Sequence, residues 1–188
     1  MLNKSILSLI FITTLVFQGC TDKKQEDISK ANSMLSLNEY VLTGLDNKQY
    51  VLKKEDNGFT LKDTKAKIII LDVFATWCPP CQKGASHLNS IQEKYKDDVL
   101  VIGVNIEDSI PNSKLLTFRE KFNANYVLVN SKQNRPLADA VAKQLHLGDS
   151  YPIPAVAIYK DGKLVKHYIG SIQEEFIQSD IKLLLGKK

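Results

Sequence analysis

Cysteine is scarce in this sequence. The 188 residues contain three cysteines, three histidines and one tryptophan. Three cysteines are too few for a small scaffold held together by several disulfides. A structural zinc site needs four ligands, yet the third cysteine is the distant Cys20, and His87 is alone near the pair formed by Cys78 and Cys81. We therefore expect no metal site.

Long apolar runs and an excess of one charge are also missing. The apolar segment Ile6–Phe17 has about a dozen residues, whereas a membrane-spanning helix needs about 20. The 25 basic and 21 acidic residues give a formal net charge of +4, and the basic residues are dispersed. This mild balance predicts a solvated surface and gives no reason to expect nucleic acid as a partner. No internal repeat or low-complexity segment is evident.

The most informative stretch is DVFATWCPPC, which runs from Asp72 to Cys81. It includes the end of an apolar, β-branched run over 67–74 that suits a buried strand. Proline is favoured at the first position of a helix, because its missing N–H would have no partner there. We therefore expect a strand, a tight turn and a helix that begins near Pro79 or Pro80. Cys78 would then lie at the helix N-terminus and Cys81 one turn inside it.

This placement predicts redox chemistry. Unpaired N–H groups and the positive end of the helix dipole favour a thiolate at Cys78. An exposed Cys78 thiolate can attack a substrate disulfide, and a shielded Cys81 can resolve the mixed disulfide. Two disfavoured interpretations are a metal site and an inert structural disulfide; a loop as short as this one constrains the chain little. A haem attachment site would read CxxCH, but Gln82 follows Cys81.

The WCPPC motif after a strand resembles the thioredoxin superfamily, and in particular its membrane-anchored TlpA, ResA and CcmG branch. The resemblance covers roughly residues 37 to 185. It implies an α/β thioredoxin fold, with a central mixed β-sheet flanked by helices and an N-terminal β-hairpin extension. It also implies a periplasmic thiol–disulfide oxidoreductase that needs no organic cofactor, since the Cys78–Cys81 disulfide is its redox group.

The resemblance also assigns substrate contacts. Thioredoxin-like proteins carry a cis-proline that faces the cysteine pair, and Pro154 has the matching position before a strand. The Ile153–Pro154 bond would be cis, and the Ile153 backbone would pair with an extended substrate; an ordinary trans loop proline is the alternative. Trp77 and Pro79 would touch substrate beside the nucleophile. For Trp77 the alternative is a lid packed on the domain.

Asp72 lies six residues before Cys78, inside the apolar strand. A buried carboxylate is costly and keeps its proton or finds a partner. The position matches the buried aspartate of thioredoxin beneath the second cysteine, which implies a proton-transfer role. Alternatively, Asp72 points outward or caps a backbone group. TlpA-type relatives more often have asparagine here, so this chain departs towards thioredoxin.

Two further departures occur on the helix after the cysteines. ResA-type proteins have a glutamate three residues after the second cysteine, where this chain has Gly84. The helix-kinking proline usual two residues later is Ser86. The first change removes an acid associated with cytochrome maturation, and the second suggests a straighter helix. We interpret His87 as a surface or structural residue rather than a catalytic one.

The N-terminus resembles that of a bacterial lipoprotein. Residues 1–19 fit a signal peptide, and Gly19-Cys20 after the apolar core is similar to a lipobox. Phe17 and Gln18 depart from the usual lipobox pattern. We expect Cys20 to be lipidated and the polar residues 20–36 to act as a tether. A cleaved signal or an uncleaved anchor, and a short helix in place of the tether, are the alternatives.

The thioredoxin-like domain is expected over 37–188. A hairpin is predicted over 38–43 and 48–52, with a short edge strand at 59–61. Strands and helices then alternate, which argues for a sheet containing parallel strands. Strands are expected at 99–105, 126–129, 155–159 and 164–165, and helices at 79–95, 112–122, 136–145 and 173–184. A capping box from Ser171 to Glu174 would open the last helix.

These expectations define a lipid-anchored monomer on the periplasmic side of the inner or outer membrane. It would reduce disulfides in exported proteins such as apocytochrome c, and would receive electrons from a DsbD- or CcdA-like membrane protein. Two rival functions remain. The first is a disulfide-forming oxidant of the DsbA type, which Pro79-Pro80 and the compact length disfavour. The second is a lipoprotein scaffold that binds partners through the thioredoxin groove without turnover.

Overall fold

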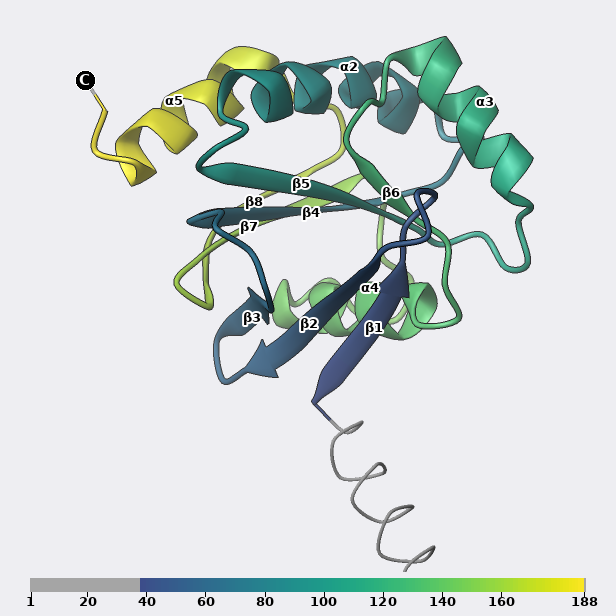
Figure 1. The fold of residues 1–188 in the computed structure, drawn as a ribbon, viewed down its shortest axis with the longest axis horizontal. Coiled ribbons are helices and arrows are strands. Elements are labelled where there is room, and N and C mark those ends of the chain that lie inside the picture. The colour runs from purple at the N-terminus through teal and green to yellow at the C-terminus, as the bar shows by residue number, and fades with distance from the viewer. Residues whose placement is uncertain (1–37, 188) are drawn as a thin grey trace, which may run out of the picture. The chain divides into compact units, whose positions relative to one another are not determined.

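Figure 1 shows the computed structural model, which describes residues 38–187. The predicted signal peptide (1–19), the tether (20–36) and the lipidation site Cys20 lie outside these residues. Within the described part of the chain, no helix has the length and apolar character needed to cross a membrane.

The core of the fold is a five-stranded mixed sheet with the order β6-β5-β4-β7-β8. In the centre, β4 runs parallel to β5 and antiparallel to β7. All seven residues of β4 are buried, as expected for a β-branched apolar run with neighbours on both edges and both faces. The strands are β4 (Ile68–Phe74), β5 (Val99–Asn105), β6 (Val127–Val129), β7 (Ala155–Lys160) and β8 (Lys163–Ile169).

Helices cover both faces of this sheet (Figure 1). Three helices, α2 (Pro79–Lys94), α3 (Asn112–Phe122) and α5 (Glu174–Leu184), pack on one face, and α4 (Asn134–Gln144) packs on the other. Successive residues of a strand point to opposite faces. Accordingly, Ile68 and Ile70 join the core beneath α2, α3 and α5, whereas Ile69 and Leu71 join the core beneath α4. The predicted thioredoxin fold is confirmed.

The N-terminal extension is a separate antiparallel sheet of three strands, β1 (Glu39–Thr43), β2 (Gln49–Glu55) and β3 (Gly58–Leu61). It packs against the α4 face, where Phe59 and Tyr159 meet edge to face with ring centroids 5.4 Å apart. A single β-bridge between Gly44 and Val129 attaches it to the outer edge of β6. The predicted hairpin and its short third strand are both present.

One predicted helix start and one predicted helix cap are wrong. Helix α4 begins at Asn134, two residues before Pro136, because proline is tolerated in a first turn whose N–H groups have no partners. The capping box at Ser171 does not form. Instead Gln173 is the N-cap residue, without a side-chain cap, and Ile172 packs against the core before the helix starts. Glu174 and Glu175 place negative charge in the first turn, which the helix dipole favours.

Candidate active site

The two cysteines lie where the sequence predicted, at the start of α2. Cys78 is the N-cap residue, with φ −82° and ψ 112°, and Pro79 and Pro80 open the helix. Cys78 and Cys81 form a disulfide, with their Cα atoms 5.3 Å apart. The amide of Cys81 donates a hydrogen bond to Cys78 Sγ at 3.3 Å. Pro79 and Pro80 have no N–H, so the Cys81 amide is the first-turn donor of this helix terminus, and Cys78 Sγ is the sulfur that accepts from it.

The exposure of Cys78 differs from the prediction. In the disulfide form both cysteines are 3% exposed, so neither is the accessible member of the pair. The carbonyl oxygen of Ile153 lies 3.8 Å from Cys78 Sγ, and Ile153 packs against the core cluster that includes both cysteines. Trp77 is 66% exposed, so the alternative of a lid packed on the domain is wrong. Pro79 is also exposed.

The loop before β7 faces the cysteine pair. The Ile153–Pro154 bond is cis, as predicted from the resemblance. Pro154 is buried and lines a small cavity together with Cys81 and Asp72. The amide of Gly170 donates a hydrogen bond to the Pro154 carbonyl at 2.8 Å, which ties this loop to the end of β8. The backbone around Ile153 thus lies against the attacking position of the site.

Asp72 is buried in the middle of β4 and is 3% exposed, so the alternative of an outward-pointing carboxylate is wrong. Its Oδ2 accepts a hydrogen bond from the Tyr126 hydroxyl at 3.1 Å. Burial raises the pKa of Asp72 to about 7, and the hydrogen bond from Tyr126 opposes that rise. The shared cavity, of about 10 Å³, is close to the smallest space that holds one water molecule. Asp72 and Cys81 therefore line a cavity that has room for about one water molecule.

His87, interpreted from the sequence as a surface or structural residue, lines the same cavity. It is half-buried, and its Nδ1 lies 2.9 Å from the carbonyl oxygen of Ile172. Since a carbonyl only accepts, Nδ1 carries the proton of this contact. The ring is thereby fixed between α2 and the segment that leads into α5.

A second set of contacts holds the loop just before Cys78, and sequence reasoning missed it. Both carboxylate oxygens of Glu107 bind Thr76: Oε2 accepts from the amide at 2.6 Å and Oε1 from the hydroxyl at 3.1 Å. Gln82 Nε2 donates to the Thr76 carbonyl at 2.7 Å. All the polar groups of Thr76 are thus engaged. Trp77 and Cys78 follow directly on this fixed residue.

The Glu107 carboxylate is itself held in place. Asn105 Nδ2 donates to Oε2 at 3.0 Å, and the Glu107 amide donates to Asn105 Oδ1 at 2.9 Å. Burial alone would raise the pKa of Glu107, but the hydrogen bonds from Asn105 and Thr76 together lower it below its usual value. One signal could have pointed to Glu107: it follows β5, and the carboxyl ends of parallel strands β4 and β5 meet at one edge of the sheet.

The site contains no ready metal-binding cluster. Among residues 38–187, no three histidine, cysteine, aspartate or glutamate side chains come together to hold a metal ion. The chemically active groups gathered here are a disulfide at a helix N-terminus, a buried carboxyl that lines a cavity with its second cysteine, and a cis-proline loop beside its first. Together with the fold, they define a thioredoxin-like protein with a redox-active dithiol.

Comparison with known proteins supports the assignment to this class of protein. A family model described as Redoxin matches residues 40–184. The thiol–disulfide oxidoreductase ResA of Bacillus subtilis (strain 168) is 27% identical over 157 residues, which are 81% of this chain and 82% of that protein. The chain belongs to the Redoxin family, and it is a thiol–disulfide oxidoreductase similar to ResA.

Two solved structures share the fold. One is a secreted Mycobacterium tuberculosis disulfide oxidoreductase homologous to DsbE of E. coli, with a TM-score of 0.54 and 15% identity over 77% of this chain and 95% of that one. The other is the exposed lipoprotein thioredoxin Etrx1 of Streptococcus pneumoniae strain TIGR4, with a TM-score of 0.54 and 21% identity over 77% and 98%. At sequence identities this low, the similarity to these two structures shows a shared fold.

Proposed function

We propose that this protein is an exported reductant, in which Cys78 attacks disulfides of extracytoplasmic proteins and Cys81 resolves the resulting mixed disulfide. The observation that carries the proposal is the hydrogen bond from the Cys81 amide to Cys78 Sγ. In the reduced protein this contact stabilises a thiolate at Cys78, and the thiolate is the form that attacks.

The reaction proceeds in two exchanges. The Cys78 thiolate attacks one sulfur of the substrate disulfide, so that a Cys78–substrate disulfide forms and the other substrate sulfur leaves as a thiolate. Cys81 then loses its proton and attacks Cys78 Sγ. The Cys78–Cys81 disulfide forms and the second substrate sulfur leaves. The substrate gains two electrons and takes up two protons, and the protein is oxidised. A membrane dithiol donor of the DsbD or CcdA type would restore the reduced form.

Asp72 is the base for the second exchange in this proposal. Its carboxyl shares a cavity of about 10 Å³ with Cys81, where little water is available to take a proton. A general base works best when its pKa lies near the working pH, and the pKa of Asp72 is raised to about 7 by burial. Cys78 needs no such base, because the helix terminus already favours its thiolate.

Substrate contacts follow from the exposed surface around Cys78. Trp77, at 66% exposure, offers a large aromatic face beside the nucleophile. Pro79 is exposed next to it, and the Ile153 carbonyl lies 3.8 Å from Cys78 Sγ. We infer that an extended substrate segment pairs with the Ile153 backbone and brings its disulfide to this sulfur.

The location rests on the sequence. A signal peptide over 1–19, lipidation of Cys20 and a tether over 20–36 would hold the domain, as a monomer, on the outer side of the cytoplasmic membrane or at the outer membrane. In support, one protein with this fold is described as secreted and another as an exposed lipoprotein. Apocytochrome c is a candidate substrate, although Gly84 replaces the acid associated with that specificity.

Trapping tests the proposal. Cys81→Ser cannot resolve the mixed disulfide, so cells expressing it should accumulate exported proteins joined to Cys78 and released by reductant. Cys78→Ser is the control, which should trap none. A scaffold would instead keep its cellular role when both cysteines are replaced. An absence of reductant-sensitive adducts in the Cys81→Ser variant would contradict the proposal.

The direction of electron flow has its own test. With Pro79-Pro80 between the cysteines and a thioredoxin-like Asp72, we expect a reduction potential closer to the roughly −270 mV of thioredoxin than to the roughly −120 mV of DsbA. Equilibration with glutathione buffers measures it. A potential above about −150 mV would favour the disulfide-forming oxidant.

A further inference from the structure

Tyr126 connects the edge of the sheet to the centre of the active site. It lies just before β6 and is 3% exposed. Although it is 54 residues away from Asp72 in sequence, its hydroxyl donates a hydrogen bond to Asp72 Oδ2 at 3.1 Å. Both partners are buried, so water does not compete with this bond. It is the only hydrogen bond that the Asp72 carboxyl receives from a side chain of the described residues.

We propose that Tyr126 is a positioning residue for disulfide exchange, whose hydroxyl holds the Asp72 carboxyl beside Cys81 and stabilises its ionised form. This rests on the proposed function, in which Asp72 accepts the Cys81 proton. A hydrogen bond to a charged acceptor is stronger than one to a neutral acceptor, so the bond from Tyr126 favours the carboxylate over the acid.

The other groups around Asp72 do not supply this stabilisation. From α2, Cys81 and His87 face the shared cavity, and they are its only other titratable groups. The neighbouring strands place Gly103 of β5 and Val156 of β7 beside Asp72. The remaining lining is apolar or glycine, from Gly84, Leu88, Pro154, Gly170, Ile172 and Ile177. No lysine or arginine lines the cavity, so Tyr126 is the group that opposes the cost of burying the charge.

Tyr126 is suited to this role because it stays protonated. Burial raises the pKa of Tyr126 well above its usual value, and the neighbouring Asp72 raises it further. The phenol therefore remains a donor across the working pH range. Without it, desolvation would act on Asp72 unopposed and raise the pKa of its carboxyl further above about 7. At neutral pH a smaller fraction of Asp72 would then be able to accept a proton.

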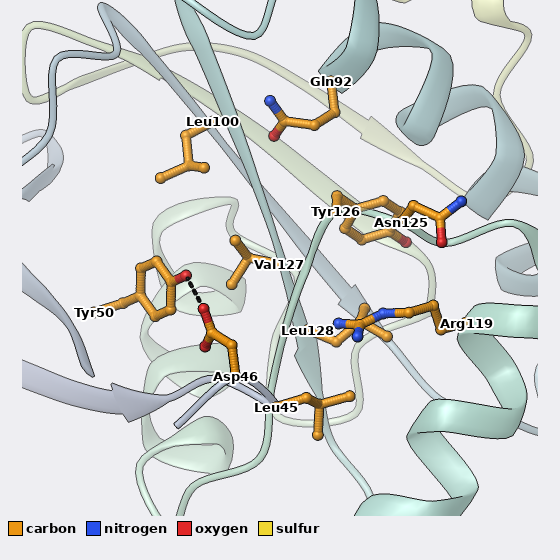
Figure 2. A pocket seen from close by; sticks show the side chains of 10 residues that line it. All are labelled: Leu45, Asp46, Tyr50, Gln92, Leu100, Arg119, Asn125, Tyr126, Val127 and Leu128. Carbon is orange, nitrogen blue, oxygen red and sulfur yellow. Dashed lines mark hydrogen bonds between the residues drawn. The ribbon is translucent and has the colours of Figure 1, made fainter. Parts of the chain in front are cut away.

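The chain offers a matched control on the same surface. The Tyr126 ring and Tyr50 line one pocket of about 340 Å³. Figure 2 shows the Tyr50 hydroxyl bonded to Asp46, at 3.3 Å. Asp46 is a solvent-exposed carboxylate on the N-terminal turn. Replacing either tyrosine with phenylalanine removes one hydroxyl and keeps the ring, but only Tyr126 contacts the active-site carboxyl.

The test compares Tyr126→Phe with Tyr50→Phe. In the reduced full chain, carbon NMR of the Asp72 carboxyl reports its titration without any turnover. We expect Tyr126→Phe to raise the midpoint by on the order of one pH unit, since hydrogen bonds to charged groups are worth about that much. The rate of mixed-disulfide resolution should then fall about fivefold at pH 7 and recover near pH 9. Tyr50→Phe should change neither quantity.

A double variant separates this inference from the proposed function. In an Asp72→Asn background, Tyr126→Phe should no longer shift the pH profile of resolution. If the Asp72 carboxyl has the same titration midpoint in Tyr126→Phe as in Tyr50→Phe, the inference is overturned. This holds even if Asp72→Asn slows resolution. If Asp72→Asn does not slow resolution, the assignment of Asp72 as the base fails. The carboxyl titration of Tyr126→Phe is a separate measurement and does not depend on that assignment.

Discussion

The amide of Cys81 donates a hydrogen bond to the sulfur of Cys78, with N and Sγ 3.3 Å apart. The two cysteines are thereby unequal, although both are buried in the disulfide form. Cys78 Sγ lies at the helix terminus and next to the Ile153 carbonyl. Cys81 lies inside the first turn and lines the cavity that holds Asp72. The nucleophile and the resolving thiol are distinguished by these contacts rather than by exposure.

Alkylation of the reduced protein should follow this inequality. Iodoacetamide at pH 7 should modify Cys78 at least about tenfold faster than Cys81, because the helix terminus favours the Cys78 thiolate. Cys78→Ser and Cys81→Ser give the rate of each remaining thiol, and peptide mass spectrometry of the wild type checks the assignment. Equal rates, or faster modification of Cys81, would reverse the roles assigned to the two cysteines.

Glu107→Gln should loosen the loop that carries Cys78. The carboxylate accepts both the amide and the hydroxyl of Thr76, and an amide replaces one of those acceptor oxygens with a donor. We expect a loss of about 1 kcal/mol in the free energy of unfolding at pH 7, after allowing for partial exposure, and slower attack on substrate.

This loss should depend on pH in a defined direction. The folded-state pKa of Glu107 lies below its ordinary value of 4.5. Its stabilisation is therefore present above about pH 4.5 and is lost as the pH falls through the folded-state value. Urea denaturation at pH 7 and pH 3 measures the difference. Glu55→Gln is the control, because Glu55 accepts a similar hydrogen bond from Thr60 on the N-terminal sheet. A loss that is the same at both pH values would argue against an electrostatic role.

Asp72→Asn should stabilise the fold at alkaline pH. The native protein keeps a proton on Asp72 up to about pH 7, whereas an unfolded aspartate loses it near pH 3.8. The stability of the wild type therefore falls as the pH rises through this window. Removing the ionisable group should add at most about 4 kcal/mol at pH 8, and little near pH 4. Denaturation of the oxidised protein measures this, with the exposed Asp97→Asn as the control. No gain at pH 8 would mean that Asp72 ionises without cost.

Strands and helices with clear local sequence signals were predicted correctly. The β-branched run of β4 and the prolines after Cys78 are local signals, and they correctly located the central strand and the start of α2. The cis bond before Pro154 came only from the resemblance. The predicted capping box does not form because Ile172 packs against the core before the helix begins. This is a tertiary contact, which a four-residue sequence pattern cannot predict.

The supporting residues of the site were less predictable. Tyr126 meets Asp72 only because β6 pairs with β5, which is the neighbour of β4 in the folded sheet. Glu107 reaches Thr76 across 31 residues of sequence because β5 pairs with β4. Periodicity and propensity describe single elements, so neither partner could be chosen before the strand order was known. The Ile153 carbonyl beside Cys78 Sγ likewise comes from a loop 75 residues further along the chain.

The central claim is that the two exchanges have different requirements, and stopped-flow measurement of both steps in Asp72→Asn tests it most directly. With a disulfide-bonded peptide as substrate, formation of the Cys78 mixed disulfide should proceed at nearly the wild-type rate, because the helix terminus stabilises that thiolate. Resolution by Cys81 should slow at least tenfold, since general bases contribute about 10²–10⁴-fold. Resolution within about twofold of wild type would contradict the account and leave Asp72 as a structural residue.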